Sequence, residues 1–197
     1  MTPTLRLYFV RHGETAWSLT GQHTGRTDLP LTAHGEEMAR ELAPTFASLP
    51  SPAVLTSPSR RARETCALAG CAAAAVREPD LAEWDYGDFE GLRTAEIRHL
   101  HPQWDVWRDG CPGGESPMQA SRRADRLIAR LLALTGDVLL FSHGQFGRVL
   151  AARWIGLAAG EGQHFGLDPA TISILGFEAD HPQRQIISLW NAPPSRA

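Results

Sequence analysis

Short apolar runs alternate in this chain with longer segments of helical periodicity, and this alternation limits the folds that the chain can adopt. Strands are predicted at residues 5–10, 53–56, 138–141, 172–177 and 186–190. Helices are predicted at residues 32–49, 60–69 and 145–154, and from Ser116 to a stop at Gly136. Strands that alternate with helices form a mostly parallel sheet covered on both faces. The sequence therefore predicts an α/β protein, a three-layer αβα sandwich around a mostly parallel sheet.

The domain organisation follows from length and from the absence of internal boundaries in the sequence. A chain of 197 residues fits one domain. No repeat or long linker divides it, so we expect a single domain over residues 1–191. Residues 192–197 include two adjacent prolines and are expected to form a disordered tail.

Charge and composition exclude several classes of partner. The net charge of −3 argues against a nucleic-acid partner. The longest uncharged apolar stretch, residues 66–76, is shorter than the roughly 20 residues that a membrane span needs, and the N-terminus lacks a signal-peptide pattern. The three cysteines are an odd number without a Cys-x-x-Cys pair, which argues against a disulfide scaffold or a zinc ribbon. We expect a cytoplasmic protein with no nucleic-acid or membrane partner.

Histidines and arginines follow three of the predicted strands. Arg11 and His12 follow the first strand, Arg61 follows the second, and His143 follows the strand at residues 138–141. Ligands of parallel sheets bind beyond the carboxyl ends of the strands, so these side chains are expected at one rim of the sheet.

Such a group of residues suits phosphoryl transfer to a histidine. Guanidinium groups bind phosphate through paired hydrogen bonds and stay charged at any working pH. A neutral imidazole can form a covalent intermediate, and cationic neighbours disfavour its protonated form. The arginines would then stabilise charge on the phosphoryl oxygens, a task that metal ions perform in other enzymes.

A proton donor for the leaving oxygen is expected in the acidic, aromatic and glycine-rich segment 82–91. A carboxyl group near apolar rings and phosphate can act as a general acid. Spacing alone does not choose among its four carboxylates, which are Glu83, Asp85, Asp88 and Glu90.

Residues 11–15, Arg-His-Gly-Glu-Thr, resemble the signature of the histidine phosphatase superfamily, the phosphoglycerate-mutase-like proteins. Other segments resemble the family's further motifs in the same order: residues 25–35, 57–65, 83–91 and 142–144. The resemblance implies the family's fold, with His12 as the nucleophile and Glu83 as the acid and then the base. It also implies that Arg11, Arg61 and His143 hold the phosphate, and that no metal ion or cofactor takes part.

The remaining segments bear on whether the chain is a phosphatase or a mutase. Mutases of this family carry an insertion and a C-terminal lid that shield the phosphohistidine, whereas the stretch between Gly91 and Ser142 is short here. A less covered site favours hydrolysis. Residues 113–116 and 170–173 resemble bacterial broad-specificity acid phosphatases more closely than the sedoheptulose-bisphosphatase-like branch.

We therefore expect a metal-independent phosphomonoesterase that acts on small phosphorylated metabolites, such as sugar phosphates, through a phosphohistidine. The alternatives are a cofactor-dependent phosphoglycerate mutase and a non-catalytic protein that binds phosphorylated ligands. A homodimer is an open alternative to a monomer, because family members often pair. The substrate side is expected to comprise Ser18, Gln22, Thr24, Gly25, Tyr86, Trp107, Gly144, Gln145 and Arg148.

Two further groups of residues have plainer interpretations. Arg122, Arg123, Arg126 and Arg130 are interpreted as a solvated or dimer-facing stripe of one helix. The His-x-His formed by residues 99–101 lacks an evident third ligand, so no metal site is predicted there.

Overall fold

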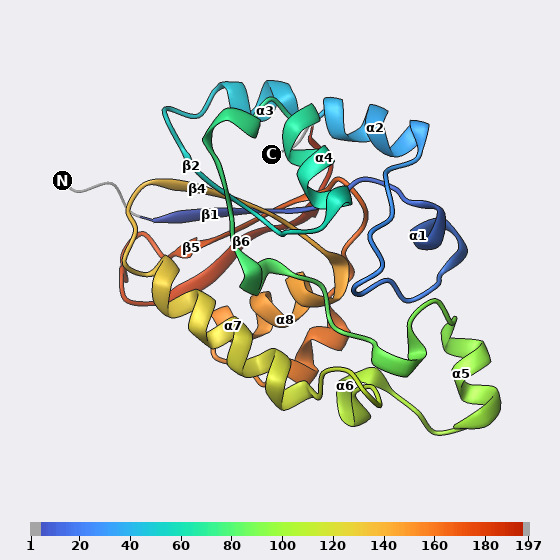
Figure 1. Ribbon diagram of the computed structural model, residues 1–197. Coiled ribbons are helices and arrows are strands. Elements are labelled where there is room, and N and C mark those ends of the chain that lie inside the picture. Colours follow the sequence, from blue (N-terminus) through green and yellow to red (C-terminus); the bar gives the residue numbers. More distant parts are fainter. Residues whose placement is uncertain (1–4, 195–197) are drawn as a thin grey trace.

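The computed structural model describes residues 5–194 and has one six-stranded sheet at its centre (Figure 1). The strand order is β3-β2-β4-β1-β5-β6, with β1 to β4 parallel to one another. Within the described sheet, β5 alone runs opposite to the other strands, because it pairs antiparallel with both β1 and β6. The strands are β1 (Arg6–Arg11), β2 (Ala53–Thr56), β3 (Ala75–Arg77), β4 (Asp137–Ser142), β5 (Ile172–Phe177) and β6 (Gln185–Ala192). The predicted α/β fold with a mostly parallel sheet is confirmed.

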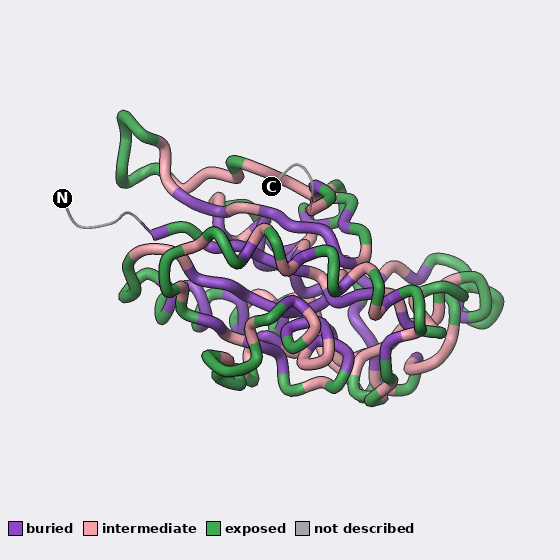
Figure 2. The backbone as a smooth tube through the Cα atoms, turned by 90° about the horizontal axis from the view of Figure 1, so that it is seen from above, coloured by how far each residue is buried: buried purple, intermediate pink, exposed green. Residues whose placement is uncertain are grey.

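Helices cover both faces of the sheet, as Figure 1 shows. On one face lie α2 (Ala33–Arg40), α3 (Ala43–Ala47) and α4 (Arg60–Leu68), and on the other lie α7 (Pro117–Leu131) and α8 (Gly144–Trp154). Successive side chains of a strand point to opposite faces. Leu7 and Phe9 of β1 accordingly pack in the core beneath α7 and α8, whereas Tyr8 and Val10 pack in a second core with Phe46 of α3. The buried parts of the backbone run through the centre of the molecule in Figure 2, and β1 and β4 are almost entirely buried.

Short helices gather near the carboxyl ends of the parallel strands, where the sequence predicted only connections (Figure 1). They are α1 (Ala16–Thr20), α5 (Thr94–Leu100) and α6 (Val106–Asp109). Single 3₁₀ turns also occur in the connections, namely η1 (Ala72–Ala74), η2 (Pro79–Leu81), η3 (Gly87–Phe89) and the longer η4 (Ala159–His164). The helices α1, α5 and α6 lie around the rim at the carboxyl ends of the strands, whereas η1 directly precedes β3 at the opposite end of the sheet.

The prediction of one helix over residues 32–49 is wrong, because α2 ends at Arg40 and α3 starts at Ala43. Pro44 has no N–H for the carbonyl of Arg40, and its ring would clash with that carbonyl in a continuous helix. The start of the helix agrees with the prediction, since the Thr32 hydroxyl accepts a hydrogen bond from the Gly35 N–H at 2.9 Å.

Near the C-terminus, β6 continues to Ala192, one residue past the expected end of the domain. The carbonyl of Pro194 accepts a hydrogen bond of 3.1 Å from the Thr45 hydroxyl. Residues 195–197 of the expected tail lie outside the described residues, and the division of the chain at residue 191 stays a prediction. Over residues 5–194, no helix is both long enough and apolar enough to cross a membrane.

Candidate active site

The sheet brings two histidines together at the carboxyl ends of β1 and β4. Arg11 is in register with Ser142, and the His12 N–H continues the ladder by donating to the Ser142 carbonyl at 3.0 Å. His143 is the next residue of the β4 segment and occupies the N-cap position of α8. The ring centroids of His12 and His143 are consequently 5.1 Å apart, in an edge-to-face arrangement.

The turn after His12 passes the start of α2 in direct backbone contact. A Cβ on Gly13 would lie 2.4 Å from the carbonyl oxygen of Gly35, and a Cβ on Gly35 would lie 2.1 Å from that of Glu14. No side chain fits at such distances, so both positions require glycine. The Gly13 N–H also donates to the Thr65 hydroxyl at 3.0 Å, which fixes the turn against α4.

The ring of His12 is held in one tautomer. Its Nδ1 lies 2.7 Å from the carbonyl oxygen of Gly13. Because a carbonyl only accepts, Nδ1 carries the proton, and Nε2 keeps a free lone pair. Burial, followed by the charges of Arg61 and Arg11, lowers the pKa of His12 well below the ordinary 6.5. The imidazole is therefore neutral, with its unprotonated nitrogen available for reaction.

Arg61 and His143 form a buried pair beside His12. Arg61 Nε donates to His143 Nδ1 at 3.2 Å, and the two terminal nitrogens donate to carbonyls of the segment 24–27. His143 Nε2, which then carries the proton, lies 2.7 Å from the Ser57 hydroxyl. Burial and the Arg61 charge lower the pKa of His143 well below 6.5, so this ring is also neutral.

A cavity of about 220 Å³ opens above His12. Most of the residues predicted for the site line it, namely Arg11, His12, Ser18, Gln22, Thr24, Glu83, Tyr86, Gly144, Gln145 and Arg148. The sequence missed four described residues that also line it, which are Thr15, Gly21, His23 and Leu167.

Four predicted residues lie behind the cavity lining. Arg61 and His143 are completely buried beneath it. The Gly25 N–H donates to the Glu90 carboxylate at 2.9 Å, away from the cavity. Trp107 lies under Arg148, whose guanidinium carbon is 4.7 Å from the ring centroid. These residues support the cavity wall from outside.

Two of the missed residues differ in the signal that the sequence offers. His23 stacks on Tyr86 with ring centroids 4.5 Å apart, and it stands in the sequence between Gln22 and Thr24, which are both predicted for the site. The Leu167 carbonyl accepts a hydrogen bond from Arg11 NH1. Nothing local marks Leu167, because the sheet brings the segment before β5 to Arg11 from a distant part of the chain.

Glu83 is the carboxylate that faces the cavity. Of the four carboxylates in the acidic segment, all of them described, Glu83 alone lines it. Asp85 pairs with Arg26 at 2.7 Å, Glu90 accepts backbone hydrogen bonds, and Asp88 is exposed.

Backbone N–H groups fix the carboxylate of Glu83 in place. Its Oε1 accepts from the N–H groups of Phe146 at 2.7 Å and Trp84 at 2.8 Å, and its Oε2 accepts from that of Gln145 at 3.0 Å. Gln145 and Phe146 belong to the first turn of α8, whose N–H groups have no partner within the helix. The first turn of α8 thus places Glu83 on the same rim as His12.

Two buried donors lack hydrogen-bond partners among the described residues, and both belong to side chains that line the cavity. They are Arg11 Nε and Gln145 Nε2. A Cβ on Gly144 would lie 3.2 Å from Arg11 Nε, so the glycine keeps the surroundings of this donor open. Buried donors without partners are costly, and an anionic ligand would satisfy them. In the described part of the chain, no group of His, Cys, Asp and Glu is arranged to hold a metal ion.

Comparison with known proteins agrees with this geometry. The model of the histidine phosphatase superfamily (branch 1) matches residues 7–192. An acid phosphatase of Mycobacterium tuberculosis is 45% identical over 193 residues, which cover 95% of this chain and 94% of that protein. Sedoheptulose 1,7-bisphosphatase of Saccharomyces cerevisiae is 39% identical, over 78% of this chain and 69% of that protein.

A solved structure matches the whole fold. It belongs to the product of an open reading frame of Mycobacterium tuberculosis and superimposes with a TM-score of 0.90 at 41% identity. The match covers 96% of this chain and 98% of that one. The arrangement of sheet, helices and connecting loops is thus shared along almost the whole length of both chains.

Proposed function

This chain belongs to branch 1 of the histidine phosphatase superfamily and is a phosphoric monoester hydrolase, and we propose that it hydrolyses small phosphorylated metabolites through a phosphohistidine on His12. The observation that carries this proposal is the neutral His12, with Nε2 free, beneath a cavity that also holds Arg11 and Glu83. No step of the proposed reaction uses a metal ion.

In the first step, Nε2 of His12 attacks phosphorus while the bond from phosphorus to the ester oxygen breaks. Glu83, as the carboxylic acid, gives its proton to that oxygen, and the alcohol leaves. In the second step, the Glu83 carboxylate takes a proton from water as the water oxygen attacks phosphorus. The N–P bond then breaks, which releases phosphate and restores neutral His12.

Cationic groups would stabilise the charge on the phosphoryl oxygens. Arg11 Nε is buried without a partner and is placed to donate to one of these oxygens. Arg61 uses four of its five N–H groups on His143 and on backbone carbonyls, so one N–H and the full positive charge remain for the phosphate. Arg61 and His143 are proposed to act from below, through His12 and the phosphate.

The far side of the cavity would bind the rest of the substrate. Arg148 and Tyr86 border this side, and Gln145 brings a donor without a partner. Arg148 is a second cation in the lining, which suits a second negative group on the substrate. The relative from yeast is named for a bisphosphate, and this supports sugar phosphates with two charged groups as substrates.

The remaining predicted contacts keep a smaller role in the proposal. The Ser18 hydroxyl already donates to the Thr15 carbonyl and accepts from the Thr15 N–H, so it shapes α1 as well as the cavity. Gln22 and Thr24 offer polar atoms at the rim, and Gly144 allows close backbone approach. Gly25 lies behind the lining, where the absence of a side chain lets it pack against the Trp84 carbonyl.

The cellular setting is part of the same proposal. All three cysteines are described and are free thiols, which supports the reducing cytoplasm as the location. Small phosphate esters, rather than nucleic acids or membranes, are the proposed partners. A second copy of the chain would pair along β6, one of the two edge strands of the described sheet, and analytical ultracentrifugation distinguishes dimer from monomer.

The test is phosphate release from a panel of monoesters in the presence of EDTA, with wild type beside His12→Ala. The panel contains p-nitrophenyl phosphate, sugar monophosphates and bisphosphates, 3-phosphoglycerate and nucleotides. We expect release to survive EDTA and to fall about 10³-fold or more in His12→Ala. His34→Ala, which changes an exposed histidine on α2, is the matched control and should keep wild-type activity. Release that persists in His12→Ala, or that EDTA abolishes, would refute the proposed mechanism.

A further inference from the structure

Arg123 differs from the other arginines of α7. Arg122, Arg126 and Arg130 are exposed, and the last two pair with Asp80. Arg123 is 8% exposed, because it falls on the helix face that packs into the core. The interpretation of all four arginines as one solvated stripe is therefore wrong for Arg123.

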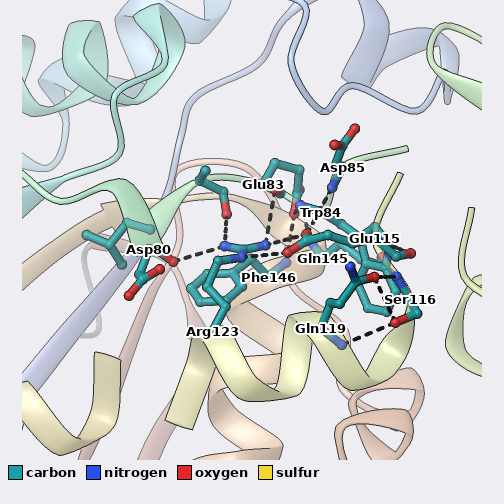
Figure 3. A network of polar contacts seen from close by, with 12 residues as sticks. Asp80, Glu83, Trp84, Asp85, Glu115, Ser116, Gln119, Arg123, Gln145 and Phe146 are labelled. Carbon is teal, nitrogen blue, oxygen red and sulfur yellow. Dashed lines mark hydrogen bonds and ion pairs between the residues drawn. The ribbon is translucent and has the colours of Figure 1, made fainter. Parts of the chain in front are cut away.

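The guanidinium of Arg123 donates hydrogen bonds to the backbone of the segment that carries Glu83 (Figure 3). Arg123 NH1 donates to the carbonyls of Asp80 at 2.9 Å and Ala82 at 2.6 Å. Arg123 NH2 donates to the carbonyl of Glu83 itself at 3.2 Å. One rigid, planar group thus holds the chain on the N-terminal side of the carboxylate that we assign as the acid.

Glu115 adds hydrogen bonds to the residues that follow Glu83. Its carboxylate accepts two hydrogen bonds from Arg123, at 2.9 and 2.7 Å. The same carboxylate accepts from the Asp85 N–H at 3.1 Å, and the Glu115 backbone N–H donates to the Asp85 carbonyl at 2.8 Å. The Glu115 carbonyl accepts from the indole N–H of Trp84 at 3.1 Å. Segment 80–85 is therefore fixed both before and after Glu83.

Arg123 also touches the helix that holds the carboxylate. Its guanidinium carbon lies 4.1 Å from the ring centroid of Phe146, a cation–π contact. The N–H of Phe146 donates to Glu83 Oε1 at 2.7 Å. The same guanidinium therefore ties together the loop of Glu83 and the first turn of α8, the two parts whose relative position sets the carboxylate.

We propose that Arg123, paired with Glu115, is a positioning residue for proton transfer by Glu83. Arg123 is not among the described residues that line the active-site cavity, so it acts through Glu83 rather than on the substrate. It borders instead a neighbouring cavity of about 470 Å³, which Glu83 also borders. A general acid must reach the leaving oxygen within about 2.6–3.2 Å, so a small displacement of the loop removes proton transfer. The proposal rests on the role of Glu83 proposed above.

If Arg123 positions Glu83, the loss of activity on replacing Arg123 depends on the leaving group of the substrate. Glycerol leaves as a strongly basic alkoxide and needs the proton, whereas p-nitrophenolate delocalises its charge and leaves without one. The measurement is the ratio of kcat/KM for glycerol 3-phosphate to kcat/KM for p-nitrophenyl phosphate. We expect Arg123→Met to lower this ratio about 30- to 100-fold. The matched control, Arg126→Met, removes an ion pair from the same helix and should change the ratio less than about twofold.

Two further sets of variants keep the test decisive. Glu83→Gln should lower the ratio about 10²-fold or more, and adding Arg123→Met to Glu83→Gln should change it less than about threefold. If Arg123→Met does not fold, Arg123→Lys and Glu115→Gln carry the test and should lower the ratio in the same direction. Far-ultraviolet circular dichroism verifies folding.

The outcomes separate the two proposals. An equal loss on both substrates in the folded Arg123 and Glu115 variants, with the ratio still sensitive to Glu83→Gln, overturns the role of Arg123 alone. A ratio that does not respond to Glu83→Gln overturns the role of Glu83, and the role of Arg123 falls with it. In either case, the loss of phosphate release in His12→Ala still supports the phosphohistidine mechanism.

Discussion

Two parts of the cavity are built by different means. The strand-end group consists of Arg11, His12, Arg61 and His143, and the outer wall consists of Gln22, His23, Tyr86, Trp107 and Arg148. Ladder hydrogen bonds of β1 and β4 place the two histidines of the strand-end group. In the outer wall, segments distant in the sequence meet, and side-chain stacks add to their backbone contacts, such as the stack of His23 on Tyr86 and that of Arg148 on Trp107.

The two parts of the cavity should therefore differ in how they respond to substitutions of side chains. A ladder is formed by backbone groups, so its geometry survives substitutions of the surrounding side chains. A stacking contact depends on the two side chains that make it. We therefore expect the strand-end group to determine the reaction and the outer wall to determine which substrate binds.

The largest effect is expected from removing a cation of the strand-end group. Arg11→Met should lower kcat/KM about 10²- to 10³-fold for every monoester, since each of them presents the same phosphoryl oxygens to Arg11. Steady-state kinetics on p-nitrophenyl phosphate, glycerol 3-phosphate and a sugar bisphosphate measures the loss. A loss confined to one of these substrates would place Arg11 in the outer wall instead.

The next largest effect is expected on the free energy of unfolding, when a substitution pushes the turn after His12 away from α2. Gly35→Ala would bring a methyl group to 2.1 Å from the Glu14 carbonyl oxygen, so the free energy of unfolding should fall by about 3 kcal/mol. Urea denaturation followed by circular dichroism gives the value. In Gly166→Ala the new methyl group meets nothing within 4 Å, and its effect should stay within about 0.5 kcal/mol. Equal stabilities for the two variants would show that the turn is not held as described.

A smaller and selective effect is expected from the cation of the outer wall. Arg148→Met should lower kcat/KM about tenfold for a sugar bisphosphate, because it removes a charged hydrogen-bond donor from the second negative group. For glycerol 3-phosphate the change should stay below about twofold. Arg148 also donates to the carbonyls of Gly162 and Gln163. A purely structural role in holding η4 would lower both values alike, and this result would remove Arg148 from substrate binding.

The smallest effect concerns acid stability. Burial, Arg61 and Arg11 lower the pKa of His12 in the folded state, whereas the unfolded chain titrates near 6.5. Below pH 6.5 the unfolded state binds the additional proton, so this contribution is complete above pH 6.5 and is lost as the pH falls. The wild-type free energy of unfolding should fall more steeply than that of His12→Gln, by at most about 1.4 kcal/mol per pH unit.

Urea denaturation between about pH 7.5 and 5.5 checks this slope. His34→Gln is the control, because His34 is exposed and its replacement should leave the wild-type slope unchanged. Identical slopes for wild type and His12→Gln would mean that His12 is not held neutral by the fold.

Much of the strand-end group could be predicted from the sequence, for a physical reason. Residues 5–10 and 138–141 are apolar runs typical of strands, and parallel strands bring the residues that follow them to one rim. The break between α2 and α3 could also be predicted, because the ring of Pro44 is not accommodated in the interior of a helix. In these cases the decisive information is local.

The choice of Glu83 and the role of Arg123 depend on distant contacts. Four carboxylates occur within residues 83–90, and spacing alone does not choose among them. The family resemblance pointed to Glu83, and its physical basis is the first turn of α8, some sixty residues later, whose N–H groups hold this carboxylate. The burial of Arg123 could be predicted from the sequence, because it precedes Leu127 by four residues and so lies on the apolar face of the helix. Its partners, the carbonyls of residues 80–83, are backbone atoms and leave no pattern in the sequence.

The direction of β1 has a practical consequence for attaching this enzyme to a support. β1 starts at Arg6, at the end of the sheet away from the cavity, and its six residues span about 20 Å before His12. The start of β1 is therefore a point of attachment far from the cavity mouth. Beads or electrodes loaded through that end would present every copy with its cavity outward, and immobilised enzyme should keep the KM of enzyme in solution.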